Sequence, residues 1–411
     1  MENKAQANIA LVNSKSRQRI VVVLGMHRSG TSAVTRALKV LGVSLGDSLM
    51  PPAEGNNSKG FWEDTKLNQF NISLLLELGL HWDSVCPVTQ ADADYLCNKG
   101  FLSDAAFLLR ERMDKEPVFG FKDPRVAKLM PFWERVFESI DCEVCYVLAV
   151  RNPVSVIKSL ENRDGFCGQK SYLLWLDYVT SSIAYCADKK VFVIDFDRLI
   201  QNPVDHLHDL AAHFDLVIDE QQLSEYETDF LDSELRHSVC EQDEVERDAR
   251  SPKMLAGVYS LFLSLASEQS RIYNAEFQQN ILGWRNELIG AKPMLSLLDK
   301  ILRVNQTNVD INSSKSNLPP LTGGLQESIA LILSHAMQCN QYTLSPLGEG
   351  LKTDKWHGSG SGFPVTPYDI ALFAKQNTGE SLPELARKIV KEKSDEFDLL
   401  VKKQEIGRAH V

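Results

Sequence analysis

Runs of consecutive apolar residues alternate along the chain with segments in which apolar residues recur every three or four positions. Short apolar runs rich in branched side chains predict strands buried on both faces, whereas the helical spacing predicts helices that bury one side. The predicted strands are residues 20–24, 118–121, 144–150 and 191–196. The predicted helices are residues 34–41, 65–80, 101–113, 127–140, 171–187, 204–214 and 254–289, and one that starts at Pro153. Because strands and helices alternate, we expect an α/β fold with a doubly wound, mostly parallel sheet flanked by helices.

Segments outside this pattern divide the chain. In order, we predict a flexible arm (1–18), the sheet domain (19–290), a linker (291–324) and a mainly helical C-terminal segment without an assigned function (325–404). The linker is predicted from residues 304–324, which are rich in Asn, Thr, Ser, Pro and Gly. Turn-forming residues also fill 44–60, which we expect to be a long loop. Residues 405–411 resemble the in-frame translation of a common sequencing-library adaptor, so we expect a cloning artefact there and a natural chain that continues past residue 404.

The composition is that of an ordinary globular protein, with 44% hydrophobic and 24% charged residues in a chain of 411. It excludes wholesale disorder, collagen and a coiled-coil rod. No apolar run reaches the ~20 residues needed to cross a bilayer, and residues 20–24 are too few for the core of a signal peptide. Eight cysteines without a C-x-x-C pair predict neither a disulfide scaffold nor a zinc module. We therefore expect a reduced, cytoplasmic protein without stable membrane insertion.

Charge is distributed unevenly. The net charge of −11 argues against broad nucleic-acid binding. Residues 1–39, however, carry seven Lys and Arg residues and one acid, whereas residues 219–248 carry twelve acids and two arginines. A basic start on an acidic protein suits a small anionic ligand, and we interpret the acidic run as a solvated face.

The first predicted strand leads through the sequence GMHRSGTS, Gly25 to Ser32, directly into a helix. The glycine spacing is that of the P-loop, in which backbone N–H groups and the helix N-terminus point at a bound phosphate. A tight turn with incidental glycines is the alternative. Thr31 stands where a nucleotide triphosphatase needs lysine, and Arg151 stands where the next apolar strand would supply a magnesium-binding Asp. The loop therefore predicts phosphate binding without the machinery for cleaving a triphosphate.

A second candidate anion site follows the strand 144–150. Arg151 is placed at the carboxyl edge of the sheet, and Asn152 and Pro153 are favourable at the start of a helix. Ser159 lies two helical turns beyond Asn152, on the same helix face. Arg151 and Ser159 together predict a phosphate clamp that faces the first loop. Alone, the segment would be interpreted as a helix cap with a surface arginine.

Together the two motifs resemble the sulfotransferases that use 3′-phosphoadenosine 5′-phosphosulfate (PAPS) as the sulfuryl donor. Over roughly residues 19–240 the chain is similar to that family, and F-D-R-L-I-Q-N-P at 196–203 is similar to a further family segment. The likeness is closest to bacterial sulfotransferases and to the tyrosylprotein and heparan-type branches. The resemblance implies that the 5′-phosphosulfate is held by His27, Arg28, Ser29, Gly30, Thr31 and Ser32, and the 3′-phosphate by Arg151 and Ser159.

The resemblance also directs the choice of catalytic residues. Sulfuryl transfer needs a base for the acceptor hydroxyl and a cation near the leaving oxygen, and it requires no metal. Glu63 in K-G-F-W-E-D occupies the region of the family's catalytic glutamate, but it is also placed to act as an N-terminal charge on the helix 65–80. Asp64 and His81 are the alternative bases.

Lys122, in F-G-F-K-D-P-R, is the candidate cation, because a similar K-D-P segment in the tyrosylprotein branch carries a lysine at the sulfate bridge. Its alternative role is a salt bridge with Asp123. Arg125 is placed to bind an anionic acceptor or the 3′-phosphate.

The leading hypothesis is therefore a PAPS-dependent sulfotransferase acting on a hydroxyl, with a carbohydrate favoured as the acceptor. A P-loop kinase and a non-catalytic nucleotide-binding domain of a larger enzyme are the alternatives. Acceptor pockets are built from loops, here expected at 44–62, 81–100 and 162–170, and loop sequences do not encode a transferable specificity.

Overall fold

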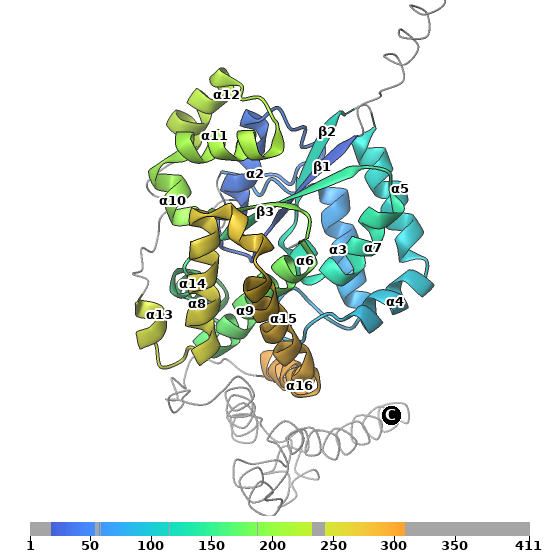
Figure 1. The fold of residues 1–411 in the computed structure, drawn as a ribbon. Coiled ribbons are helices and arrows are strands. Elements are labelled where there is room, and N and C mark those ends of the chain that lie inside the picture. The colour runs from blue at the N-terminus through green and yellow to red at the C-terminus, as the bar shows by residue number, and fades with distance from the viewer. Residues whose placement is uncertain are drawn as a thin grey trace, which may run out of the picture.

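Four parallel strands form the central sheet of the computed structural model (Figure 1). The strands are β1 (Arg19–Leu24), β2 (Val118–Lys122), β3 (Glu143–Val150) and β4 (Lys190–Asp195), in the order β2-β1-β3-β4. The predicted strands and the predicted parallel α/β sheet are thus confirmed. The structure describes residues 18–53, 57, 59–114, 116–186, 188–231 and 243–308, without the side chains of 301 and 303–308. The arm before residue 18 and the predicted segments beyond residue 308 lie outside the described residues.

The strands are buried on both faces because both faces are covered by helices. Along β1, Ile20, Val22 and Leu24 belong to one apolar core, and Val21 and Val23 belong to the other. This division follows from the two-residue period of a strand, which sends successive side chains to opposite faces. A run without alternation of polar and apolar residues is therefore what such a sheet requires.

One face of the sheet packs against a small set of helices. These are α2 (Thr31–Val40), α10 (Phe196–Gln201), α11 (Pro203–Phe214), α12 (Glu220–Glu225) and the π-helix η1 (Tyr226–Phe230). Figure 1 shows α2, α11 and α12 gathered together at the upper left. Tyr226 of η1 is fully buried and donates a hydrogen bond to the Ala33 carbonyl of α2, which fixes the two elements together.

The opposite face is covered by a larger helical layer. Its members are α3 (Thr65–Glu77), α4 (Gln90–Asn98), α5 (Phe101–Met113), α6 (Pro124–Lys128), α7 (Met130–Ser139), α8 (Pro153–Asp164), α9 (Gly168–Cys186), α14 (Lys253–Ser267), α15 (Ala275–Gly290) and α16 (Lys292–Asn308). The short helix α13 (Glu244–Arg247) precedes α14. The single helix predicted at 127–140 is in fact the end of α6 followed by α7.

The prediction of a single helix over residues 254–289 is wrong. The structure has α14, a 3-10 turn η3 (Gln269–Tyr273) and then α15. The Asn274 side chain accepts hydrogen bonds from the backbone N–H groups of the second and third residues of α15. Because asparagine is among the best N-cap residues, it starts a new helix where the apolar spacing alone suggested continuity.

Two segments predicted to lack helices are helical. Residues 90–98 form α4, which begins with a capping box between Thr89 and Asp92. Residues 292–308, assigned to the linker, form α16, because its first turns carry apolar side chains that are buried in the core. The rest of the predicted linker lies outside the described part of the chain.

The strand order places a ligand crevice at β1. From β1 the chain crosses to β2 on one side, and later to β3 on the other. In an open parallel sheet, ligands bind outside the carboxyl ends of the strands at such a reversal. The loop after β1 and Arg151 after β3 are therefore neighbours at this edge.

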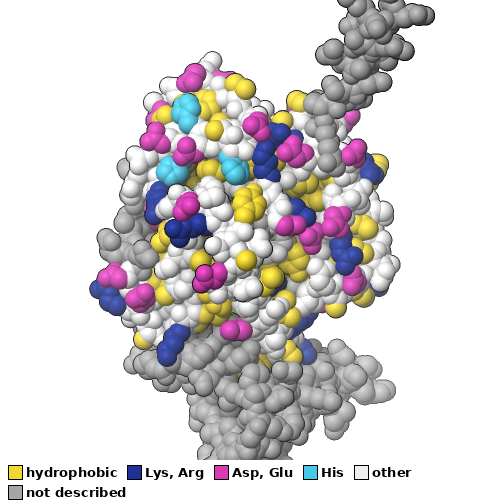
Figure 2. All heavy atoms as spheres, viewed as in Figure 1, with side chains coloured by type: hydrophobic (Ala, Val, Ile, Leu, Met, Phe, Trp, Pro, Cys, Tyr) yellow, Lys and Arg dark blue, Asp and Glu magenta, His cyan; other side chains and the backbone are white. Residues whose placement is uncertain are grey.

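The surface shows how charge is distributed over the fold. On the face shown in Figure 2, acidic and basic side chains are interspersed, so this side of the described chain carries no broad basic field. Within the described residues, no helix is both long enough and apolar enough to cross a membrane.

Candidate active site

A cavity of about 170 Å³ lies at the carboxyl edge of the sheet. All four strand ends contribute to its wall: the Gly25–Gly30 loop after β1, Lys122 at the end of β2, Arg151 after β3 and Phe196 after β4. Among the predicted site residues, those that line it are His27, Arg28, Gly30, Thr31, Ser32, Glu63, Lys122 and Arg151. The topology has thus brought most of the predicted residues to one place.

The loop after β1 needs glycine at its end for two reasons. Gly30 has a φ of 81°, in the left-handed region, and it is the residue from which α2 begins. A Cβ atom at this position would also lie 2.0 Å from the ring of Phe196. The second glycine of the motif is therefore required by the backbone and by the close approach of Phe196, whatever the loop binds.

Arg28 connects the two predicted anion motifs. Its Nε donates a hydrogen bond of 2.7 Å to the Ser159 hydroxyl, and its carbonyl accepts one of 3.2 Å from Arg151 Nη1. The Arg151 guanidinium also lies over the Phe196 ring, 4.9 Å from its centroid. Asn152 caps α8 and Pro153 is its first residue, as the sequence predicts. The Ser159 hydroxyl contacts Arg28 and is not part of the cavity wall, so its contact with a 3′-phosphate stays a prediction.

Glu63 and Lys122 form a buried ion pair in the cavity wall. Lys122 Nζ lies 2.7 Å from Glu63 Oε1, and the two residues are 2% and 6% exposed, respectively. The other carboxylate oxygen, Oε2, accepts a hydrogen bond of 2.8 Å from Asn68 and lies 3.9 Å from Arg125 Nη1. Lys122 also donates a long hydrogen bond of 3.4 Å to the Ser32 hydroxyl of α2. The pair is therefore connected directly to the helix that follows the loop.

Asp64 and His81, the alternative candidates for the base, lie outside the cavity wall. Asp64 is the N-cap of α3, and its carboxylate also contacts Arg112 at 2.7 Å. Asp64, and not Glu63, is therefore the N-cap of α3, and Glu63 directly precedes it. Asp64 does not line the cavity, and His81 is exposed and lies outside the cavity wall as well. Among the described acidic residues, Glu63 is the one that lines the cavity.

Lys122 does not pair with the adjacent Asp123. Asp123 accepts hydrogen bonds from Arg125 at 2.9 Å and from Asn71 at 3.0 Å. Burial raises the pKa of the Asp123 carboxyl, and Arg125 opposes that shift. The alternative salt bridge of Lys122 is thus wrong, and Asp123 instead orients Arg125 beside the cavity.

Positive charge dominates the wall of the cavity. Five cationic side chains line it, namely Arg28, Lys59, Lys122, Arg151 and Arg163, against the single described acid. Burial and the neighbouring Arg163 and Arg151 lower the pKa of Arg28, because nearby positive charges disfavour its charged form. Such crowding of like charges is characteristic of a site that binds an anion.

Two buried polar atoms of the loop have no hydrogen-bond partner among the described residues. They are Ser29 Oγ and His27 Nε2. Buried polar atoms are nearly always paired in folded proteins, so each such atom calls for an explanation. Of these two residues, His27 lines the cavity and Ser29 does not. Unpaired polar atoms in a glycine loop beside several cations are compatible with a nearby phosphate or sulfate group.

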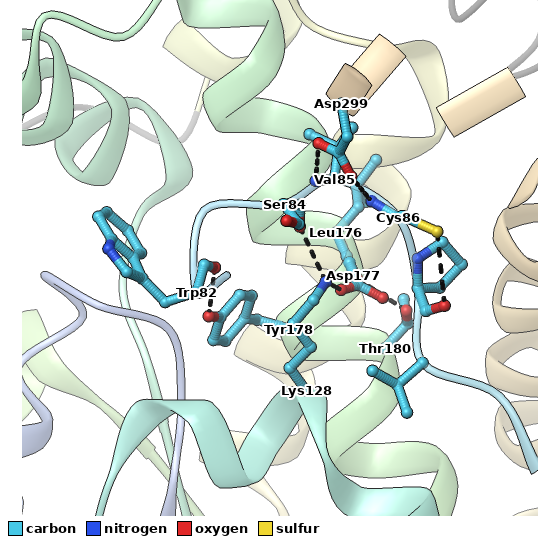
Figure 3. Close-up of polar contacts among 12 residues, drawn as sticks. Trp82, Ser84, Val85, Cys86, Lys128, Leu176, Asp177, Tyr178, Thr180 and Asp299 are labelled. Atoms are coloured by element: carbon cyan, nitrogen blue, oxygen red, sulfur yellow. Dashed lines mark hydrogen bonds and ion pairs between the residues drawn. The ribbon is translucent and has the colours of Figure 1, made fainter. Parts of the chain in front are cut away.

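A neighbouring loop, drawn in Figure 3, carries Trp82, whose ring contacts His27 of the anion loop. Its backbone is fixed by side chains from several helices: Tyr178 donates to the Trp82 carbonyl at 2.6 Å, Lys128 donates to the Ser84 carbonyl at 2.9 Å, and Asp299 accepts from the N–H groups of Val85 and Cys86. The Trp82 ring centroid lies 4.5 Å from that of His27. The position of His27 is therefore set by a rigid neighbour as well as by its own loop.

Several residues in or beside the cavity wall are not predicted from the sequence. Arg163 follows Ser159 by four residues, so it lies on the same helix face, and that spacing was a usable signal. Lys59 lies in the K-G-F-W-E-D segment that was selected for Glu63 alone. Phe230 and Trp82 carried no local signal, because only the tertiary fold brings them near the loop.

Comparison with known proteins gives limited information. No family model and no curated protein matches the sequence. Among solved structures, the chain is similar to the sulfotransferase domain from the Synechococcus PCC 7002 olefin synthase, with 15% identity and a TM-score of 0.33. The match covers 67% of this chain and 96% of that one. A TM-score this low does not establish a common fold, so the function has to be inferred from the site itself.

Proposed function

We propose that this protein transfers a sulfuryl group from PAPS to a hydroxyl acceptor, with a carbohydrate favoured. The observation that carries the proposal is that one cavity is lined by the glycine loop, by Arg151 and by the Glu63–Lys122 pair. An anion cradle, a second anion-binding arginine and an acid–cation pair are the groups that sulfuryl transfer needs. PAPS supplies the activated sulfuryl group when it is bound.

The same residues argue against a kinase. Thr31 follows Gly30 where a kinase of the P-loop class carries the lysine that contacts the β- and γ-phosphates. Arg151 follows β3 and donates a hydrogen bond to the Arg28 carbonyl of the loop, whereas a magnesium site requires a carboxylate at this position. A cation in this place favours a second phosphate over a metal ion.

The residues that would hold the donor follow from the two motifs. His27, Arg28, Ser29, Gly30, Thr31 and Ser32 are proposed to hold the 5′-phosphosulfate, and Arg151 and Ser159 the 3′-phosphate. The unpaired Ser29 hydroxyl and the excess of cations support this assignment. Arg28 contacts both Ser159 and Arg151, so both phosphate sites would respond to its position.

Glu63 is proposed to take the proton of the acceptor hydroxyl. Each carboxylate oxygen has two acceptor sites, so the bonds to Lys122 and Asn68 leave room for the acceptor. Lys122 is proposed to place its positive charge near the oxygen that leaves with the nucleotide. Their ion pair holds both side chains in place within a buried wall.

Calorimetric titration with adenosine 3′,5′-bisphosphate and with ATP tests the donor. We expect the bisphosphate to bind much more tightly than ATP or AMP; equal affinity for AMP would contradict the assignment of Arg151. Turnover of a sulfate-labelled donor with a panel of glycosides then separates an enzyme from a non-catalytic binding domain. Activity should persist in excess EDTA, and activity restored by magnesium would favour the kinase.

A further inference from the structure

His27 occupies an unusual position in the anion loop. It lines the cavity, and its ring lies against the rings of Trp82 and Tyr178, with centroids 4.5 and 5.9 Å away. Its Nε2 is buried and has no hydrogen-bond partner among the described residues. The ring is therefore held in place by packing, while one of its nitrogens lacks a partner.

The charged groups with the largest effect on the pKa of His27 are cationic. They are Arg28 from its own loop, Lys122 and Arg125 from the end of β2 and the start of α6, and Arg163 from α8. Tyr178 of α9 also faces the ring, and burial raises the pKa of its phenol, which therefore stays neutral. Three of these cations are paired with carboxylates: Lys122 with Glu63, Arg125 with Asp123, and Arg163 with Asp164.

Burial and these four cations lower the pKa of His27 well below its ordinary value of 6.5. At neutral pH the ring is consequently neutral. An anion in the cavity opposes the electrostatic cause, because its negative charge compensates the cations. The imidazolium then becomes the favoured form.

We propose that His27 takes up a proton from solvent when a phosphonucleotide anion binds in the cavity. The loop thus gains a positive charge only when it is occupied. This inference rests on the proposed donor, and it adds to the assignment of His27 to the 5′-phosphosulfate: the positive charge of the ring is absent from the free protein. Reciprocity of linkage requires that the nucleotide bind more tightly as pH falls through the range in which the bound form of His27 titrates.

Proton uptake is measured by titrating the whole protein with adenosine 3′,5′-bisphosphate at about pH 7 in two buffers of different ionisation enthalpy. Wild type should take up at least about 0.3 proton per nucleotide more than His27→Gln. The nucleotide's own phosphates, with a second pKa of about 6, contribute equally to both proteins and cancel in the difference. Equal proton uptake by the two proteins, with binding retained, would overturn the inference alone.

His213→Gln is the matched control. Burial also lowers the pKa of His213, but this residue packs on Phe192 and is not part of the cavity wall. The control should show the same uptake as wild type. If His27→Gln and His213→Gln lose proton uptake to the same degree, the assignment to His27 is overturned.

A second measurement needs no variant protein. Wild-type protein labelled at the histidine ring carbons is titrated with pH by NMR, with and without the nucleotide. Without the nucleotide, one histidine ring should stay neutral over the whole pH range. With the nucleotide bound, the same ring should titrate, with a pKa higher by more than about one. If no ring responds although the nucleotide binds, the inference is wrong. If the nucleotide does not bind at all, the proposed function is rejected and the inference with it.

Discussion

Lys122 and Glu63 are 59 positions apart in the chain, yet their charged groups lie 2.7 Å apart inside the cavity wall. Lys122 ends β2, and Glu63 lies in the segment that leads into α3. A buried ion pair is a weak source of stability, because the loss of hydration offsets most of the attraction. The pair is therefore better explained by chemistry at the cavity than by stabilisation of the fold.

Glu63→Gln tests the base. The substitution keeps shape and hydrogen bonding but removes basicity, so kcat should fall by roughly 10²–10⁴. Affinity for adenosine 3′,5′-bisphosphate should be unchanged or higher, because a negative charge is removed from an anion site. Kinetics with the most active acceptor and calorimetry measure the two effects. Glu111→Gln, which removes one side of an exposed ion pair with Lys66, is the control and should retain full activity. An active Glu63→Gln enzyme would exclude Glu63 as the base.

Lys122→Ala tests the cation. Turnover should fall by roughly 10²–10³, the scale of removing one group that stabilises developing charge. The defect should shrink when PAPS is replaced by an aryl sulfate with a less basic leaving group, whereas the Glu63→Gln defect should persist. A defect in Lys122→Ala that is independent of the leaving group would mean that Lys122 acts only by holding Glu63.

Arg151→Ala tests the second anion site. The Arg151 residue is 6% exposed and reaches the loop through the Arg28 carbonyl. Loss of a buried charge-assisted contact should weaken binding of adenosine 3′,5′-bisphosphate by about 2–4 kcal/mol. Binding of AMP, which lacks the 3′-phosphate, should change much less. An equal loss for both nucleotides would place Arg151 at the 5′ side.

The fold was more predictable from sequence than the contacts within the site. Fully apolar runs specify strands buried on both faces, so all four strands were found, and the glycine loop was recognisable from its spacing. The contact of Arg28 with Ser159 was not predictable, because the sequence indicated which residues face the crevice but not which of them pair. The helix at 90–98 was missed for a different reason: few of its residues are buried, although the Thr89–Asp92 capping box was visible.

Asp92 should make stability depend on pH. Burial opposes its charged form, but hydrogen bonds from Lys292 and Thr89 lower its pKa below the ordinary 3.8. A carboxyl group with a lowered pKa in the folded state contributes stability above its unfolded pKa, and the contribution is lost as pH falls through the folded pKa. Urea unfolding gives the free energy of unfolding of wild type and Asp92→Asn between about pH 6 and pH 3. The difference between the two free energies should become smaller as the pH falls. A constant difference would mean that Asp92 acts through its geometry as a cap alone.

The buried ions beneath the Trp82 loop should respond unequally to substitution (Figure 3). Asp177 of α9 is fully buried and contacts both Lys128 of α6 and Arg285 of α15. Asp177→Asn leaves two buried cations without their anion and should lower the free energy of unfolding by about 3–5 kcal/mol.

Lys128→Met should lower the free energy of unfolding less, because Asp177 keeps Arg285 as a partner and methionine fills a similar volume. It should nevertheless affect turnover, since Lys128 also holds the Ser84 carbonyl in the loop that positions Trp82 against His27. Lys66→Met, at an exposed pair, serves as the control and should change stability by less than about 1 kcal/mol. Urea denaturation gives the three free energies. Equal losses for Asp177→Asn and Lys128→Met would show that Arg285 contributes nothing to the network, whereas the predicted order would identify Asp177 as the anion shared by helices α6 and α15.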